Sequence, residues 1–286
     1  MRALILLALV PAVAFAQADE KAATIAFVKS LQDPETGAFA ASAPKPGEKL
    51  KPGLRATNGG VRALRYLGAE LPRKEKAALF VLNCYDPKTG TFAEPGGKAD
   101  VTITAVGYLA AAELGVAEKR CAKAIEYLGA NAKTFEEVRI AAAAVELADA
   151  WPAQTGEWFK LADAQLDPDG AAGKGDGRGR DTGSVFAMRL RLQQKVNYTD
   201  AAKLALRTPR ADGGYGKTGE ASELDSTYRV MRALMLLKDK PTDPANVLAF
   251  VGRCRNADGG YGVKPGEPST LSGVYYAGII RQWLAK

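Results

Sequence analysis

Asp212-Gly213-Gly214-Tyr215-Gly216 and Asp258-Gly259-Gly260-Tyr261-Gly262 are two copies of one five-residue stretch, placed 46 residues apart. Each copy lies between two segments whose apolar residues recur at helical spacing. Weaker versions of the same turn occur earlier, at residues 36–39, 89–92 and 169–173. A glycine–aromatic turn that returns at a regular interval is the signature of a helical repeat protein.

The turns divide the chain into six units. Their markers, which are the turn aromatics or the residues in their place, are Phe39, Phe92, Phe135, Ala172, Tyr215 and Tyr261. The third unit has no glycine turn, and an alanine fills the aromatic position of the fourth. The periodicity predicts a first helix before each marker, within residues 24–31, 76–84, 119–128, 157–165, 200–206 and 245–254. It predicts a second helix after each marker, within residues 60–67, 102–114, 136–148, 182–192, 226–237 and 271–284.

Helix pairs of this period could form an open solenoid of the armadillo or HEAT kind. The glycine-rich turn and the count of six pairs instead favour closure. Strand-like alternation is nearly absent. We therefore predict an all-α fold, an (α/α)6 toroid that forms a closed double barrel of helical hairpins over residues 19–286. The second helices would make the inner barrel and the first helices the outer one.

The N-terminal residues are typical of an export signal. Arg2 is followed by an apolar run over residues 3–15 and by the small-x-small site Ala14-Phe15-Ala16. Cleavage after Ala16 or after Ala18 fits equally well, so residues 1–18 are assigned to the signal peptide. The run is too short to span a membrane. The sequence thus predicts a secreted or periplasmic protein.

Charge and cysteine content exclude several function classes. The formal charge of +7 is spread along the predicted helices without a Lys/Arg block, which disfavours nucleic-acid binding and favours a solvated, slightly cationic surface. Cys84, Cys121 and Cys254 are widely separated and form no CxxC motif. Buried single cysteines are favoured over a disulfide framework.

A second pattern follows the fifth turn. Gly213-Gly214-Tyr215 precedes Leu224-Asp225-Ser226-Thr227-Tyr228, and the sixth unit has Lys264-Pro265-Gly266 ahead of Tyr276. Helix pairs with these motifs resemble the superfamily of protein prenyltransferase β-subunits and squalene/hopene cyclases, which has an (α/α)6 toroid. The resemblance covers most of the chain and is most specific in the last two units. The prenyltransferase branch matches better, because the Asp-x-Asp-Asp acid motif of the cyclases is absent.

The resemblance implies a zinc site whose residues are not all present. In the prenyltransferases the Asp and Cys of an Asp-Gly-Cys-Tyr motif and a later His bind zinc, and the Tyr contacts the isoprenoid diphosphate. Asp225 and Tyr228 match that motif, but Thr227 replaces the Cys, Gly273 stands at the His position, and the chain has no histidine. One carboxylate with a threonine does not form a useful zinc site. We expect no metal, no cofactor and no thiol prenylation by the family mechanism.

Three aspartates near the starts of second helices are the candidate catalytic residues, namely Asp225, Asp181 and Asp100. Ser269 is placed similarly. In a closed toroid they would gather at one rim, close enough to act as an acid–base set. The simpler interpretation is that most of them are N-caps, which satisfy free backbone N–H groups.

Basic and aromatic residues provide candidate ligand contacts. Residues 173–180 form a glycine-rich basic loop that could hold an anion at the start of a second helix, although a solvated loop is the simpler interpretation. Only one lysine lies where the family's diphosphate-binding residues fall. Tyrosines on second helices could line the cavity or fill the core. The candidate ligand contacts are Tyr228, Lys217, Arg178, Arg180 and Tyr276.

The sequence favours a non-enzymatic role. We expect an exported binding or scaffold module without the zinc site, whose ligand is apolar or polymeric: isoprenoid-like, glycan or peptide. The alternative is a zinc-independent transferase or cyclase, or a polysaccharide-cleaving enzyme, that uses inner-rim carboxylates. A protein-interaction toroid and the presence of a partner subunit stay open.

Overall fold

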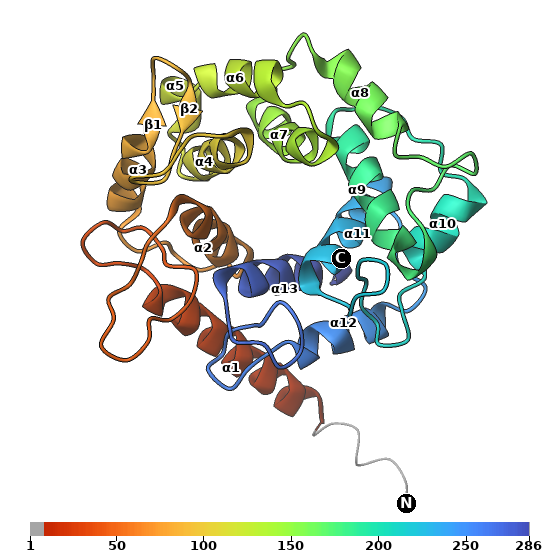
Figure 1. The fold of residues 1–286 in the computed structure, drawn as a ribbon. Helices are drawn as coiled ribbons and strands as arrows, with labels where there is room; N and C mark the ends of the chain where they lie inside the picture. Colours follow the sequence, from red (N-terminus) through yellow and green to blue (C-terminus); the bar gives the residue numbers. More distant parts are fainter. Residues whose placement is uncertain (1–8, 286) are drawn as a thin grey trace, which may run out of the picture.

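The computed structural model describes residues 9–285, and its helices form two concentric layers (Figure 1). The inner layer consists of α2 (Leu54–Tyr66), α4 (Val101–Glu113), α7 (Phe135–Ala148), α9 (Arg178–Arg191), α11 (Leu224–Leu237) and α13 (Leu271–Leu284). The outer layer consists of α1 (Leu9–Ser30), α3 (Lys74–Asn83), α6 (Lys123–Asn131), α8 (Thr155–Asp163), α10 (Asp200–Arg207) and α12 (Pro244–Arg253). The connections contain the short helix α5 (Ala117–Arg120), the 3-10 helix η1 (Gly175–Gly177) and the antiparallel strands β1 (Tyr85–Asp86) and β2 (Thr91–Phe92). The predicted all-α (α/α)6 toroid is confirmed.

The toroid closes between its first and last units. Each inner helix packs against the next along the chain, and α13 packs against α2. At this seam the Thr24 hydroxyl donates a hydrogen bond to the Gly259 carbonyl at 2.8 Å, and the Leu271 N–H donates to the Ala41 carbonyl at 2.9 Å. The open-solenoid alternative is therefore wrong.

The repeated glycine turn explains how neighbouring units join. Gly213 has φ +81° and packs so closely on the start of α12 that a Cβ atom would lie 2.1 Å from the Asn246 carbonyl oxygen. Gly259 has φ +83° and makes the equivalent approach to Ala23 of α1, which carries the repeat across the seam. Only glycine combines this backbone conformation with such a close contact. Each turn thus lies against the outer helix of the following unit.

A threonine hydroxyl on the following inner helix fixes most of the turns. It accepts a hydrogen bond from the backbone N–H of the marker residue in four units, at 2.9–3.2 Å. The pairs are Phe39 with Thr57, Phe92 with Thr104, Ala172 with Thr182 and Tyr215 with Thr227. Ala172 therefore occupies the aromatic position of the fourth unit, as its spacing predicts. Thr227 belongs to this structural series.

The third unit departs from the repeat. Phe135, the predicted marker, is not in a turn but is the first residue of α7. Thr134 caps this helix in a reciprocal capping box with Glu137, so α6 connects to α7 through a short segment without glycine. The expectation of a turn aromatic at Phe135 is wrong, because a capped helix start takes the place of the glycine turn.

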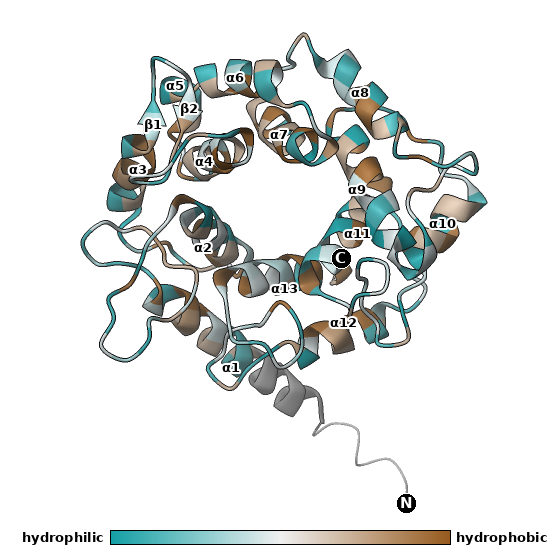
Figure 2. Cartoon of the chain, in the orientation of Figure 1, coloured by the Kyte–Doolittle hydropathy of each residue, from teal (hydrophilic) through white to brown (hydrophobic). Residues whose placement is uncertain are grey.

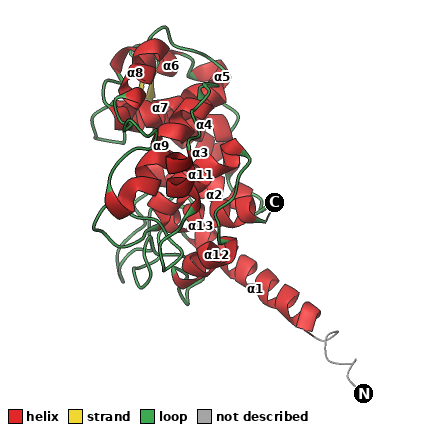
Figure 3. Cartoon of the chain, turned by 90° about the vertical axis from the view of Figure 1, so that its right-hand side faces the viewer, coloured by secondary structure: helices red, strands yellow, loops and turns green. Residues whose placement is uncertain are grey.

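The N-terminal half of α1 projects beyond the toroid in the side view (Figure 3). Residues 1–8 of the predicted signal peptide lie outside the described part of the chain. No helix within residues 9–285 is long and apolar enough to cross a membrane. The buried side chains described for α1 begin at Thr24 and continue with Phe27 and Val28, and Leu31 directly after the helix is also buried. The seam therefore depends on residues beyond the predicted cleavage sites.

Hydropathy distinguishes the inner helices from one another (Figure 2). Helix α4 is almost entirely buried and apolar, as expected for an inner helix. Helices α2 and α9 instead carry hydrophilic turns, teal in Figure 2, although they belong to the same layer. Polar side chains on inner helices indicate that the centre is not a simple apolar core.

The three cysteines, of which Cys121 and Cys254 are buried, are free thiols.

Candidate functional site

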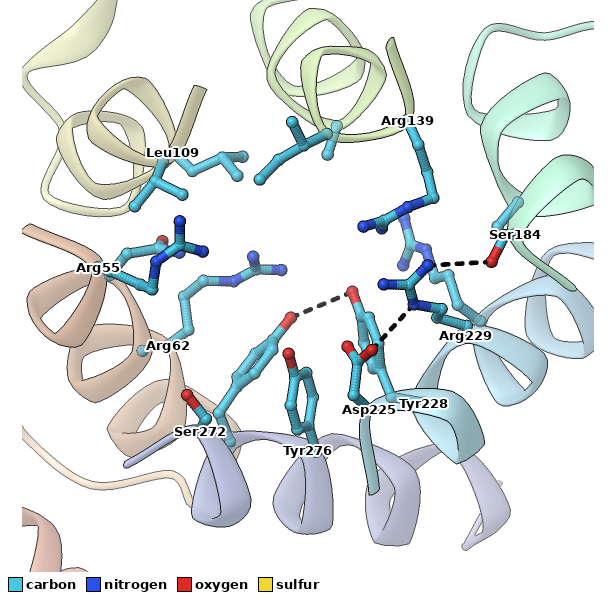
Figure 4. Close-up of a pocket in the computed structure, with 18 of the residues that line it drawn as sticks. Arg55, Arg62, Leu109, Arg139, Ser184, Asp225, Tyr228, Arg229, Ser272 and Tyr276 are labelled. Atoms are coloured by element: carbon cyan, nitrogen blue, oxygen red, sulfur yellow. Dashed lines mark hydrogen bonds and ion pairs between the residues drawn. The ribbon is translucent and has the colours of Figure 1, made fainter. Parts of the chain in front are cut away.

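A cavity of about 260 Å³ lies at the centre of the inner layer (Figure 4). One wall is apolar and comes from α4, α7 and α9. Its side chains are Val106, Leu109, Ile140, Ala143, Ala187 and Met188. The rest of the lining is rich in guanidinium and phenol groups, which come from α2, α11 and α13 and, for Arg139 and Arg191, from α7 and α9. The cavity therefore presents an apolar side and a polar, cationic side to whatever occupies it.

Six arginines from four inner helices line the cavity: Arg55, Arg62, Arg139, Arg191, Arg229 and Arg232. In Figure 4, Arg62 reaches towards the centre from α2, and Arg139 and Arg229 lie on the opposite side. The side chains of Arg191 and Arg229 are each only 10% exposed. Guanidinium groups hold their charge at any ordinary pH. The centre is therefore a fixed cluster of positive charge.

Carboxylates neutralise this cluster only in part. Glu146 accepts from both Arg191 at 2.8 Å and Arg232 at 3.0 Å. Glu136 is likewise shared between Arg139 at 2.9 Å and Arg229 at 3.0 Å. Two carboxylates thus form ion pairs with four guanidinium groups.

The remaining ion pairs do not neutralise the rest of the positive charge. Asp225 lies 3.0 Å from Arg229, which is already shared. Glu113 lies 3.4 Å from Arg62 and also pairs with Arg65 at 2.8 Å. Arg55 forms no ion pair with any residue in the described range. Four carboxylates therefore face six lining arginines, and the cavity keeps a net positive charge.

Aromatic side chains form the floor beside the arginines. The Tyr228 ring lies 5.1 Å from that of Tyr276 and 5.7 Å from that of Trp283, which stacks on it. The Tyr275 hydroxyl is 3.3 Å from the Tyr228 hydroxyl, and the Arg62 guanidinium lies 4.8 Å above the Tyr275 ring. Cation–π contacts of this kind hold the guanidinium groups in place.

These surroundings shift the acidity of the polar groups. Burial raises the pKa of Glu136, but the ion pairs with Arg139 and Arg229 outweigh it and lower that pKa to about 2. Burial and the neighbouring Asp225 raise the pKa of Tyr276. Burial also acts to raise the pKa of Tyr228, but the surrounding guanidiniums prevail and lower it to about 8. The cavity thus holds Glu136 ionised and makes one tyrosine unusually acidic.

Three of the predicted site residues come together in this cavity. Asp225, Tyr228 and Tyr276 all line it, from the first two turns of α11 and α13 (Figure 4). Asp225 is not an N-cap, because Glu223 precedes α11 and the Asp225 carboxylate instead pairs with Arg229 one turn later. The capping interpretation is wrong for this residue.

The other candidate aspartates lie elsewhere. Asp100 is exposed and caps α4 by accepting from the Ile103 N–H at 2.7 Å, as the capping interpretation predicts. Asp181 is inside the first turn of α9, where it pairs with Arg180 at 2.6 Å. Thr270, not Ser269, caps α13. Asp225 is the only one of the three aspartates that lines the central cavity, and the acid–base set stays a prediction.

The predicted basic contacts also lie outside the cavity. Arg178 pairs with Asp169, and Arg180 pairs with Asp181 at 2.6 Å, beside a separate hollow at the rim. Lys217 is exposed and lies 3.5 Å from Glu220. Because each of these cations already has a carboxylate partner, the glycine-rich loop is not a ready anion site.

The residues at the family's zinc positions do not fit a zinc ion. Thr227 is fully buried and uses its hydroxyl within the turn, accepting from the Tyr215 N–H and donating to the Glu223 carbonyl at 2.8 Å. At Gly273 a Cβ atom would lie 2.1 Å from the Tyr261 carbonyl oxygen, so a histidine requires a different backbone. Asp225 is paired with Arg229. In the part of the chain that the structure describes, no three His, Cys, Asp or Glu residues form a metal-binding group.

The arginine cluster is absent from the sequence prediction. The basic residues were expected on a solvated surface, because charge on an amphipathic helix normally faces water. A usable signal is the Arg229-x-x-Arg232 spacing, which puts two guanidiniums on one face of a helix expected to be internal. Arg62 is a similar case, lying between buried Val61 and Ala63 on α2.

Solved structures show the same architecture at low sequence identity. The type II terpene cyclase MstE from Scytonema superimposes with a TM-score of 0.61 at 13% identity, covering 94% of this chain and 97% of that one. A variant of it, solved with its substrate geranylgeranyl dihydroxybenzoate, gives a TM-score of 0.59 at 14% identity over 93% and 96% of the two chains. A structure described as a wild-type glycosidase gives 0.60 at 13% identity over 93% and 95%. These structural similarities show that the chain shares its fold with those proteins.

Sequence comparison identifies the family. No curated protein sequence matches this chain. The family described as "Prenyltransferase alpha-alpha toroid domain" matches residues 2–140 and 184–286. The unmatched segment, residues 141–183, runs from within α7 through α8 and the fourth turn to the first residues of α9. Since the match covers most of the sequence, the chain belongs to the prenyltransferase α/α toroid domain family.

Proposed function

We propose that this protein is an exported binding toroid without zinc chemistry, and that its central cavity takes an acidic ligand with an apolar portion. The observation that carries the proposal is the surplus of guanidinium groups in a cavity that aliphatic side chains also line. The partly buried arginines share their carboxylates, and the exposed Arg55 has no ion-pair partner among the described residues. A ligand that brings negative charge would complete the pairing of the arginines, and its apolar part would cover the aliphatic side chains.

The size of the cavity and the resemblance to prenyltransferases limit the ligand further. A volume of about 260 Å³ suits a short chain of roughly ten carbons with a compact head group better than a polymer. The substrate of the neighbouring terpene cyclase combines an isoprenoid chain with a benzoate. An isoprenoid-like acid or phosphate ester is therefore the favoured class, ahead of a glycan or a peptide.

An enzyme that uses carboxylates is the second candidate, because Asp225 lies in the cavity beside Tyr276. Two features oppose it. The ion pairs with Arg139 and Arg229 lower the pKa of Glu136 to about 2, which makes it a poor proton donor, and the Asp225 carboxylate is paired with Arg229. Six guanidiniums also oppose positive charge on a substrate, and cyclisation through a cationic intermediate builds up such charge. The cavity is better suited to binding an anion than to making a cation.

Calorimetric titration with three related probes tests the proposal. Geranyl diphosphate combines an apolar chain with charge, geraniol keeps the chain without charge, and inorganic pyrophosphate keeps the charge alone. We expect geranyl diphosphate to bind at least tenfold more tightly than either part, because it engages both walls. Equal binding of geraniol and geranyl diphosphate would contradict the role of the arginines. Release of pyrophosphate or a cyclised product during incubation would support the enzyme instead.

Export is part of the proposal and has its own test. Among the side chains whose burial is described, residues 18 and 19 are exposed and the buried ones begin at Thr24, so we expect the toroid to form without the signal peptide. Protein recovered from an exporting host is expected to begin at Gln17 or Asp19, as read by N-terminal sequencing. The same chain expressed without residues 1–18 should melt within about 2 °C of the exported protein. An intact Met1, or misfolding of the shortened chain, would contradict this.

A further inference from the structure

Tyr228 occupies a position that the binding proposal alone does not explain. Its hydroxyl accepts a hydrogen bond from the Tyr275 hydroxyl at 3.3 Å and lies 3.5 Å from the Arg191 guanidinium, and Arg62 and Arg232 line the same cavity. Its ring is fixed by stacking on Trp283 and by contact with Tyr276. A phenol held in this way can donate a proton to a hydrogen bond or lose it to become an anion.

The charged and titratable groups around this hydroxyl come from every neighbouring element. They are Arg62 on α2, Glu146 on α7, Arg191 on α9, Asp225, Arg229 and Arg232 on α11, and Tyr275 and Tyr276 on α13. Guanidinium groups stay charged over the pH range in question. Burial raises the pKa of both Tyr275 and Tyr276. No lysine, histidine or cysteine is among the described residues that line the cavity.

We infer that Tyr228 makes anion binding in the central cavity proton-linked. As a phenol, Tyr228 donates a hydrogen bond to the acidic group of the ligand. As a phenolate, it supplies the negative charge itself, satisfies the guanidiniums and repels the ligand. This inference rests on the proposed function and adds to it that the ligand enters only when Tyr228 carries its proton.

The linkage sets the direction of the pH dependence. In the free protein the pKa of Tyr228 is lowered to about 8. A bound anion offsets the guanidiniums and raises this pKa again, so binding is accompanied by proton uptake. Affinity is therefore constant below about pH 8 and falls by up to tenfold for each pH unit above it. Between about pH 7 and about pH 9.5 the expected loss is roughly 10- to 30-fold.

Octyl sulfate below its micellar concentration is a suitable probe, because its charge does not change over this range. Calorimetric titration at several pH values should show the loss of affinity in the wild type and none in Tyr228→Phe. The variant loses a hydrogen bond but cannot form a phenolate, so it should bind more weakly than wild type near neutral pH and more tightly at about pH 9.5. A purely structural role for Tyr228 would not produce this crossover. Tyr276→Phe is the matched control and should keep the pH dependence.

A second readout needs no ligand. The near-ultraviolet absorbance of the free protein should show one phenolate forming near pH 8, absent in Tyr228→Phe and suppressed by saturating octyl sulfate. Binding that does not change between about pH 7 and about pH 9.5 would overturn the inference and leave the proposed function standing. A failure of octyl sulfate, geranyl diphosphate and pyrophosphate to bind at any pH would overturn both.

Discussion

Replacement of Gly213 by alanine should destabilise the protein by about 3–5 kcal/mol, among the largest effects of any single methyl group in the toroid. Gly213 has φ +81°, which costs an L-residue about 1–2 kcal/mol. The added Cβ would also lie 2.1 Å from the Asn246 carbonyl oxygen, so the turn must move away from α12. The clash is with the backbone of Asn246 in the first turn of α12. Neither the turn nor the helix can therefore move aside at little cost in free energy.

Gly219 is the matched control for this substitution. It has φ +73°, nearly the same backbone conformation, but no atom lies within 4 Å of the position of its Cβ. Gly219→Ala should therefore cost only the conformational part, about 1 kcal/mol. Thermal unfolding followed by circular dichroism would separate the two, with midpoint decreases of about 10 °C and about 3 °C. Equal decreases would show that the contact with α12 contributes nothing.

Replacement of Arg62 by glutamine should weaken the binding of geranyl diphosphate by roughly 10- to 100-fold. Arg62 lines the cavity, and its side chain is only 14% exposed. A charge-assisted hydrogen bond to a partly buried guanidinium contributes about 1.5–3 kcal/mol. The fold should tolerate the change, because Glu113 keeps Arg65 as its partner at 2.8 Å.

Arg65 is the control that the structure provides. It lies on the same helix and pairs with the same carboxylate, but its side chain is 54% exposed and does not line the cavity. Arg65→Gln should change the affinity by less than about twofold, as expected for a solvent-screened ion pair. Calorimetric titration of both variants measures the difference. Similar losses in the two variants would place the anion outside the central cavity.

The fold was predictable because the decisive information is local. A five-residue turn such as Asp212 to Gly216 combines a positive φ, an aromatic and a close approach, and its return at a fixed period specifies the helix pairs. The alanine of the fourth turn was correctly placed by spacing alone. Phe135 was misplaced because the third unit replaces the glycine turn with a capped helix start. The repeat spacing is the same for a glycine turn and for a capped helix start, so it does not distinguish them.

The site was predictable only in part. Asp225, Tyr228 and Tyr276 were found through the family motif, and they do line the cavity. The arginines were missed because a guanidinium that faces the centre of a toroid has the same helical spacing as one that faces water. Thr227 was interpreted as a lost metal ligand, although it belongs to a series with Thr57, Thr104 and Thr182 that hydrogen-bonds the turns. These roles depend on contacts between distant segments, which no single stretch of sequence contains.

The seam between Thr24 and Gly259 has a consequence for how the chain acquires its structure. The other joints connect neighbouring units and can form as soon as both have been synthesised. The seam joins residues 235 positions apart, so it cannot form until the last unit is complete. Before that, the chain is an open arc with two uncovered ends, the state in which a repeat protein is most exposed to aggregation or proteolysis. Once closed, no unit is terminal, and unfolding must start by breaking a joint rather than by fraying from an end.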